Sequence, residues 1–107
     1  MDGQDITINK LEEDISLLIR HIKMLRVTKD NQPVGIIRLS EITDIPKHKI
    51  RYSLRLLEKD GVIAPTPEGA TVTEKYESYM RDTLAYMERL RRSVDEVETL
   101  LKDALAQ

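Results

Sequence analysis

The chain has 107 residues, a length that suits one compact domain with an extension. It contains no cysteine, which excludes a disulfide framework and thiolate-based metal or redox chemistry. Its only aromatic residues are four tyrosines, so its core has to consist of Ile, Leu, Val and Met. No apolar run is long enough to span a bilayer, and residues 1–10 lack the features of a signal peptide. The expected compartment is the cytoplasm.

The net charge of −2 is unevenly distributed along the chain. Residues 1–45 carry six Lys/Arg and eight Asp/Glu, and residues 74–107 carry the same numbers. Residues 46–73 instead carry five Lys/Arg and three Asp/Glu. Because basic clusters are the electrostatic footprint of nucleic-acid binding, any such surface is expected in the middle of the chain.

The first predicted element is a helix over about residues 9–27. Its apolar residues recur at spacings of three and four, which places them on one stripe: Ile8, Leu11, Ile15, Leu18, Ile22 and Leu25. Asn9 and Glu12 have the spacing of a capping box, so Asn9 is the expected N-cap. The polar run 28–33 ends in proline and predicts a break.

A short second helix is predicted over about residues 33–43. Pro33 is expected at its first position, where no N–H donor is needed. Its apolar face consists of Ile36, Leu39 and Ile42. Residues 44–46 end this helix, because the residue before a proline is pushed out of the helical region.

The next predicted helix covers about residues 47–60. Its inner stripe consists of Ile50, Leu54 and Leu57, with Ser53 on the same face. Gly61 stands where a helix-ending glycine belongs. Two short strand candidates follow within residues 62–73, and the turn signals at Pro67 and Gly69 predict that they form a β-hairpin.

Residues 74–106 contain neither proline nor glycine and predict one long helix. Its apolar residues follow a heptad seam in which Thr83 is the one polar member: Tyr76, Met80, Met87, Leu90, Val94, Val97, Leu101 and Ala104. Leu84, Leu100 and Leu105 flank the seam. The e and g positions mix apolar and charged residues, which leaves parallel and antiparallel pairing open. Such a seam needs a partner surface, and we expect a second copy of this helix.

The order of these elements, together with three local motifs, resembles the archaeal-type winged helix-turn-helix transcriptional regulators. Residues 39–46 (LSEITDIP) are similar to the helix-and-turn half of the motif, with Asp44 where glycine is common. Residues 57–63 (LEKDGVI) resemble the end of the recognition helix and the start of the wing, and residues 73–75 (TEK) resemble the entry to the following helix.

The resemblance implies a mostly α fold with a small β-hairpin wing and a long C-terminal dimerisation helix. The winged helix-turn-helix domain would comprise residues 1–73, with a recognition helix at 47–60 and a wing at 62–73. Residues 74–107 would form the dimerisation helix. The expected dimer contacts are Met80, Leu84, Met87, Leu90, Val94, Val97 and Leu101.

In such folds the recognition helix lies in the major groove of double-stranded DNA, with its outer face toward the bases. The outer-face residues, which are the expected DNA contacts, are Lys47, His48, Lys49, Arg51, Tyr52 and Arg55. Arg51 and Arg55 are one turn apart, and an arginine can hold guanine with two hydrogen bonds. No acidic residue occurs between residues 46 and 57.

Two other interpretations stay open. The basic face can simply be a solvated helix face. The net charge of −2 and the wing tip, which has an acid but no base, favour a winged-helix protein interaction module without direct DNA contact. At that tip, backbone N–H groups and Thr66 are the groups that can still reach a phosphate.

Nothing in the sequence indicates an enzyme, a cofactor, a metal site or a small-molecule ligand. His21 lies beside the apolar stripe of the first helix and is interpreted as a packing residue rather than a ligand. Met80 and Met87 are interpreted as packing residues as well.

Overall fold

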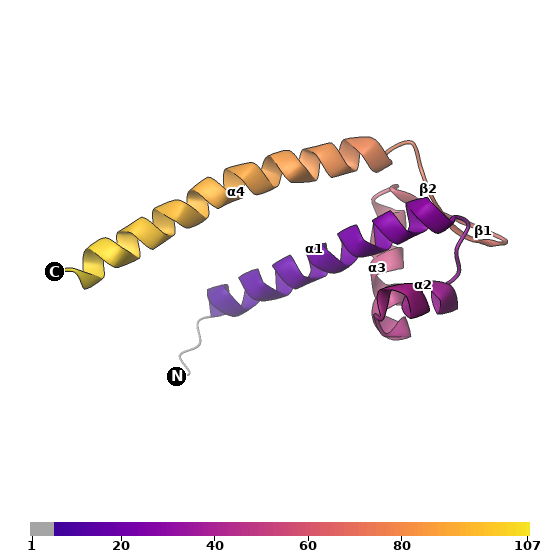
Figure 1. Ribbon diagram of the computed structural model, residues 1–107, viewed down its shortest axis with the longest axis horizontal. Helices are drawn as coiled ribbons and strands as arrows, with labels where there is room; N and C mark the ends of the chain where they lie inside the picture. The colour runs from indigo at the N-terminus through magenta and orange to yellow at the C-terminus, as the bar shows by residue number, and fades with distance from the viewer. Residues whose placement is uncertain (1–5) are drawn as a thin grey trace. The chain divides into compact units, whose positions relative to one another are not determined.

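The computed structural model describes residues 6–107, so residues 1–5 of the N-terminal segment 1–10 lie outside it. The described part is mostly helical (Figure 1). Its elements are the helices α1 (Ile6–Asn31), α2 (Ile36–Thr43), α3 (Lys47–Lys59) and α4 (Tyr76–Leu105), and the strands β1 (Ile63–Thr66) and β2 (Gly69–Val72). The two strands form an antiparallel hairpin. The chain divides into two compact units, Met1–Tyr76 and Glu77–Gln107. The expected mostly α class, with one small hairpin and a long last helix, is confirmed at this level.

Helix α1 is longer at both ends than the sequence predicted. It already begins at Ile6, so Asn9 lies inside the helix and the predicted N-cap is wrong. It continues through residues 28–31, which are polar but contain no helix breaker. Thr28 is fully buried, and the Asn31 side-chain amide donates to the backbone oxygen of Val27 at 2.9 Å. The helix ends only where the following proline excludes the helical conformation.

Helix α2 begins at Ile36, after an extended Gly35, and not at Pro33 as predicted. The cause is the backbone of Val34, which pairs with Ala70 of β2 through two hydrogen bonds. The Val34 N–H donates to the Ala70 oxygen at 3.0 Å, and the Ala70 N–H donates back at 2.8 Å. Because Val34 is held against the hairpin, the chain turns into a helix only after Gly35.

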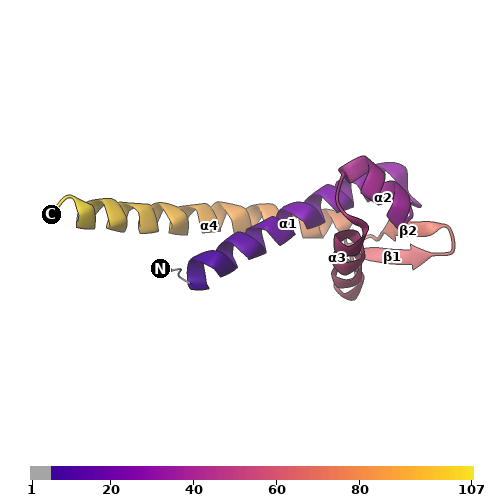
Figure 2. The same ribbon diagram turned by 90° about the horizontal axis from the view of Figure 1, so that it is seen from below.

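The core of the first unit lies where the C-terminal half of α1 meets α2, α3 and the hairpin. Figure 2 shows α3 running across that half of α1, with the hairpin beside it. The buried apolar residues are Met24, Leu25, Val34, Leu39, Ile50, Leu54, Leu57, Val62, Ile63 and Ala70. The predicted inner stripe of α3 is therefore confirmed. On the N-terminal half of α1 the stripe residues Ile8, Leu11 and Ile15 instead remain exposed, as does the adjacent Ile19.

Helix α4 spans 30 residues, which corresponds to about 45 Å. It begins at Tyr76 because Thr73 organises the preceding turn: its carbonyl accepts the Tyr76 N–H and its hydroxyl accepts the Lys75 N–H. None of its residues is buried. The Thr83 hydroxyl donates to the Tyr79 backbone oxygen at 2.7 Å. The one polar residue of the seam therefore finds a hydrogen-bond acceptor within its own helix. No described helix is both long and apolar enough to cross a membrane.

The hairpin depends on Gly69, at the first position of β2. Strand pairing places Thr66 opposite Gly69, which leaves residues 67–68 as a two-residue loop and confirms the predicted hairpin. Gly69 has φ +137°, a conformation that disfavours other residues. A Cβ atom at this position would also lie 2.6 Å from the backbone carbonyl carbon of Val34. Glycine thus allows the segment before α2 to lie directly against β2.

We predict that Gly69→Ala lowers the free energy of unfolding by about 2 kcal/mol or more, because it combines an unfavourable φ with a backbone clash. Gly35→Ala is the matched control. Gly35 has φ −88° and an added Cβ would meet nothing within 4 Å, so a loss below about 1 kcal/mol is expected. Urea denaturation followed by circular dichroism measures both. Equal losses for the two variants would contradict this role of Gly69.

Candidate nucleic-acid interface

The turn between α2 and α3 determines how α3 is presented. Asp44 adopts the left-handed conformation with φ 59°, which short polar side chains tolerate better than most. Its N–H donates to the backbone oxygen of Ser40 at 2.8 Å. The Ser40 hydroxyl in turn donates to the Ile45 oxygen at 2.6 Å. These bonds join Ser40 of α2 to Asp44 and Ile45 in the turn before α3, so the turn is held against the end of α2.

The other end of α3 is closed by Gly61, whose φ of +78° confirms its predicted helix-ending role. Its N–H donates to the Glu58 oxygen at 3.0 Å, and the Val62 N–H donates to the Leu57 oxygen at 3.0 Å. This pair of bonds is the Schellman arrangement, which satisfies the last helix carbonyls and turns the chain sharply. Since Leu57 and Val62 are both buried, the same turn anchors β1 to the core.

The outer face of α3 carries the side chains predicted from sequence to contact DNA. All six are exposed: Lys47, His48, Lys49, Arg51, Tyr52 and Arg55. None of them forms a side-chain hydrogen bond or ion pair with another described residue. No acidic residue lies within positions 46–57, and Glu58 in the last turn of α3 forms no ion pair with these side chains, so four permanent cations face solvent unpaired.

The structure adds two arginines from other helices to this surface. Arg38 of α2 lines a depression together with Arg51, and Glu41 of α2 lines it as well. Arg20 of α1 lines another with Arg55 and three further α3 residues: His48, Lys49 and Tyr52. The sequence did not single out either residue. Each lies on a different helix from the basic run, and only the packing of α1 and α2 against α3 brings them to it.

Arg20 is also held in place by α3. Its Nε donates a hydrogen bond of 2.7 Å to the Ser53 hydroxyl oxygen, and Ser53 is fully buried. Arg20 as a residue is partly exposed and lines the depression, so its side chain reaches from the buried Ser53 to this surface. The helix spacing in the sequence predicted that Ser53 faces inward, but it gave no sign of this partner.

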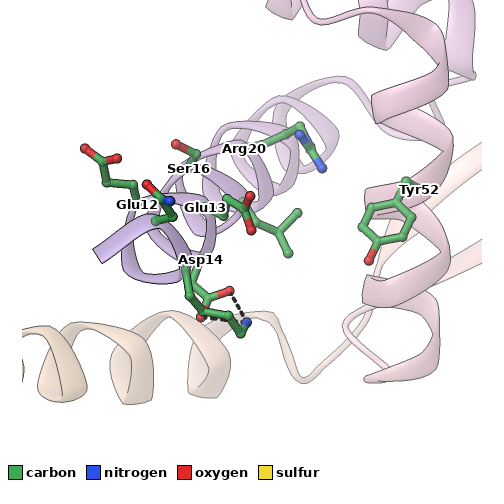
Figure 3. A pocket seen from close by; sticks show the side chains of 9 residues that line it. Glu12, Glu13, Asp14, Ser16, Arg20 and Tyr52 are labelled. Atoms are coloured by element: carbon green, nitrogen blue, oxygen red, sulfur yellow. Dashed lines mark hydrogen bonds and ion pairs between the residues drawn. The ribbon is translucent and has the colours of Figure 1, made fainter. Parts of the chain in front are cut away.

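Along α1 the sign of the charge changes beside this surface. A further open depression is lined by Arg20 and Tyr52 at one end and by the acidic run 12–14 at the other (Figure 3). Within that run, Asp14 accepts an ion pair from Lys10 at 3.0 Å. The part of α1 that adjoins α3 is therefore cationic, whereas the part toward its N-terminus is mainly anionic.

The tip of the hairpin offers less for an anion. Pro65, Pro67 and Glu68 are exposed, and no basic residue lies among them. The Thr66 hydroxyl donates to the Gly69 oxygen at 2.6 Å and accepts the Glu68 N–H at 3.2 Å. Its only hydrogen is thus used inside the turn, so donation from Thr66 to a phosphate would require this hydrogen bond to break.

The two histidines lie in different environments. His48 is exposed on α3, whereas His21 of α1 is only 7% exposed, in agreement with its interpretation as a packing residue. Burial lowers the pKa of His21, the positive charge of Arg20 lowers it further, and the carboxylate of Asp60 opposes both. Among residues 6–107 no group of three or more His, Cys, Asp or Glu side chains could hold a metal ion.

Comparison with known proteins provides no family for this chain. No model of a known protein family matches it, and no curated protein sequence matches it significantly. Its function has to be inferred from the residues themselves and from their arrangement.

We predict that the wild-type protein loses stability through His21 as the pH falls below about 6.5, the ordinary pKa of histidine. In the folded state the pKa of His21 is lowered, so the unfolded chain binds the proton more readily and acid favours unfolding. His21→Gln should therefore show a smaller decrease in the free energy of unfolding between pH 7 and pH 5. Urea denaturation at one fixed protein concentration measures this.

The exposed His48 provides the matched control for this experiment, since no buried imidazole is removed in His48→Gln. This control should retain the pH dependence of the wild type. If His21→Gln also retains it in full, the buried imidazole is not a source of the acid sensitivity.

Proposed function

We propose that this chain is a winged helix-turn-helix protein that binds double-stranded DNA as a homodimer and regulates transcription. In this proposal α2, the turn at Asp44 and α3 form the helix-turn-helix, and the β1–β2 hairpin is the wing. The observation that carries the proposal is the outer face of α3. It is exposed and cationic, with no acidic residue between positions 46 and 57 and its one acid, Glu58, in the last turn, while the opposite face of the same helix is buried in the core.

The chemistry of this face suits DNA. Arg51 and Arg55 can hold guanine O6 and N7 through two hydrogen bonds each or neutralise a phosphate. Lys47, His48 and Lys49 lie at the start of α3, the end that contacts base edges and adjacent phosphates in this class of protein. The hydroxyl of Tyr52, whose side chain is 48% exposed, can donate to a phosphate.

The dimer is supported by apolar surface that the single chain leaves uncovered. In α4, large apolar side chains remain more than half exposed: Leu84, Val94, Val97, Leu100, Leu101 and Leu105. The exposed stripe of α1, at residues 8–19, is a second such surface. A second copy that covers these surfaces would supply two recognition helices, which address half-sites about 34 Å apart in proteins of this class.

A protein interaction module is the second candidate function, and the hairpin favours it. The tip exposes Glu68 and no base, and the Thr66 hydroxyl is used inside the turn. Salt dependence separates the two candidates, because phosphate neutralisation makes DNA affinity fall steeply as salt increases. Negligible and salt-independent binding to duplex DNA would favour the interaction module.

We predict that Arg51→Ala combined with Arg55→Ala weakens binding to duplex DNA by about tenfold or more and lowers the salt slope, because two cationic contacts are lost. Fluorescence anisotropy with a random duplex between 50 and 200 mM salt measures affinity and slope. Circular dichroism should show an intact fold, since both side chains are exposed. Arg92→Ala with Lys102→Ala removes the same charge from α4 and should leave binding unchanged. An unaltered affinity and slope in the α3 variant would disprove this site.

We predict that the intact chain sediments near 25 kDa, twice its mass of 12.4 kDa. Val97→Lys with Leu101→Lys should shift it to the monomer mass, because two charges would be buried in the seam. Ala85→Lys with Thr99→Lys adds the same charge on the opposite face of α4 and should leave the dimer intact. Sedimentation velocity at micromolar concentration measures all three. A stable wild-type monomer under these conditions would contradict the dimer.

A further inference from the structure

The edge of α1 beside α3 has the features of a phosphate site. Four cationic or ionisable side chains from two helices line one open depression there: Arg20 from α1, and His48, Lys49 and Arg55 from α3. Tyr52, which lies between them on α3, adds a hydroxyl. No acidic side chain lines this depression. The charge and the hydrogen-bond donors converge from two elements, which a single solvated helix face does not provide.

Arg20 is the member of this group whose position is most strongly determined. Its Nε is occupied by the buried Ser53 hydroxyl at 2.7 Å, which leaves the two terminal amino groups of the guanidinium for a ligand. Because one hydrogen bond already restrains the long side chain, less conformational entropy is lost when it binds an anion. The two remaining amino groups lie in one plane and can each donate a hydrogen bond to a different oxygen of one phosphate.

We infer that Arg20 binds a backbone phosphate of the DNA beside α3, so that the DNA-binding surface extends from α3 onto the middle of α1. This inference depends on the proposed function and names a contact on a helix that the sequence did not assign to DNA. The phosphate would lie at the edge of the groove that receives α3, and it would fix the rotation of α3 about its own axis. Contacts to phosphates position a protein on the duplex without reading its sequence.

The charges along α1 also define where this surface ends. Beyond Arg20, toward the N-terminus, the adjoining depression is lined by the acidic run 12–14 (Figure 3). These carboxylates repel phosphates, so the DNA backbone has to leave α1 just past Arg20. One phosphate contact per protomer is therefore the expected contribution of α1.

Arg20→Gln tests this contact. The slope of log affinity against log salt should decrease by about one per protomer, because one fewer counterion is released. Affinity at 50 mM salt should fall by about threefold to tenfold, equally for any duplex sequence, because the contact is to the backbone. Fluorescence anisotropy of the full chain on two unrelated duplexes measures both quantities.

Two further variants separate this role from a structural one. Ser53→Ala removes the hydrogen bond to Arg20 but keeps the charge, so it should leave the salt slope at the wild-type value. Arg26→Gln removes one charge from the same helix, on the side that lines a depression with Ile42 and Thr43 rather than with α3. It should also leave the slope unchanged.

The outcomes distinguish a failure of the Arg20 contact from a failure of the proposed DNA binding. A wild-type slope in Arg20→Gln, with binding still lost in the Arg51 and Arg55 variant, overturns this inference alone. A reduced slope in Arg26→Gln equal to that in Arg20→Gln overturns it as well, because the effect would not be specific to the Arg20 charge. If the wild type shows no salt-dependent binding, the proposed function itself fails.

Discussion

The burial of one face of α3 is the constraint on which the rest of the first unit depends. Ile50, Leu54 and Leu57 are all within the core, and burying each such side chain contributes about 1.5–3 kcal/mol. Rotating α3 about its axis would expose this stripe, so the packing fixes which side chains face outward. Arg51 and Arg55 are therefore presented to solvent as a consequence of what their neighbours bury. The proposed function uses a surface that the hydrophobic effect orients.

Backbone geometry at three positions supports this orientation. The left-handed Asp44 sets the path from α2 into α3, and Gly61 sets the path from α3 into β1. Gly69 allows Val34 to pair with β2, which ties the segment before α2 to the hairpin. The elements on both sides of α3 are thus connected to each other as well as to α3. This arrangement also brings Arg20 and Arg38 to the edges of the cationic face.

Local signals in the sequence predicted most of what depends on local physics, although the capping-box spacing at Asn9 did not mark the start of α1. The inner stripe of α3, the helix-ending Gly61 and the hairpin were all predicted, because periodicity and turn chemistry act over a few residues. The start of α2 was not, since the pairing of Val34 with a strand more than 30 residues away overrides the preference of proline for a first helical position. The contribution of Arg20 was missed for the same reason: its bond to Ser53 is created by packing between helices.

The central claim is that α3 presents a DNA-binding face, and amide chemical-shift mapping tests it most directly. A short duplex titrated into the isotope-labelled full chain at low salt should shift the amides of residues 47–55, with smaller changes around Arg20. The amide shifts of the C-terminal half of α4 should remain unchanged. Shifts confined to α4, or no shifts at a duplex concentration in excess of the protein, would contradict the account.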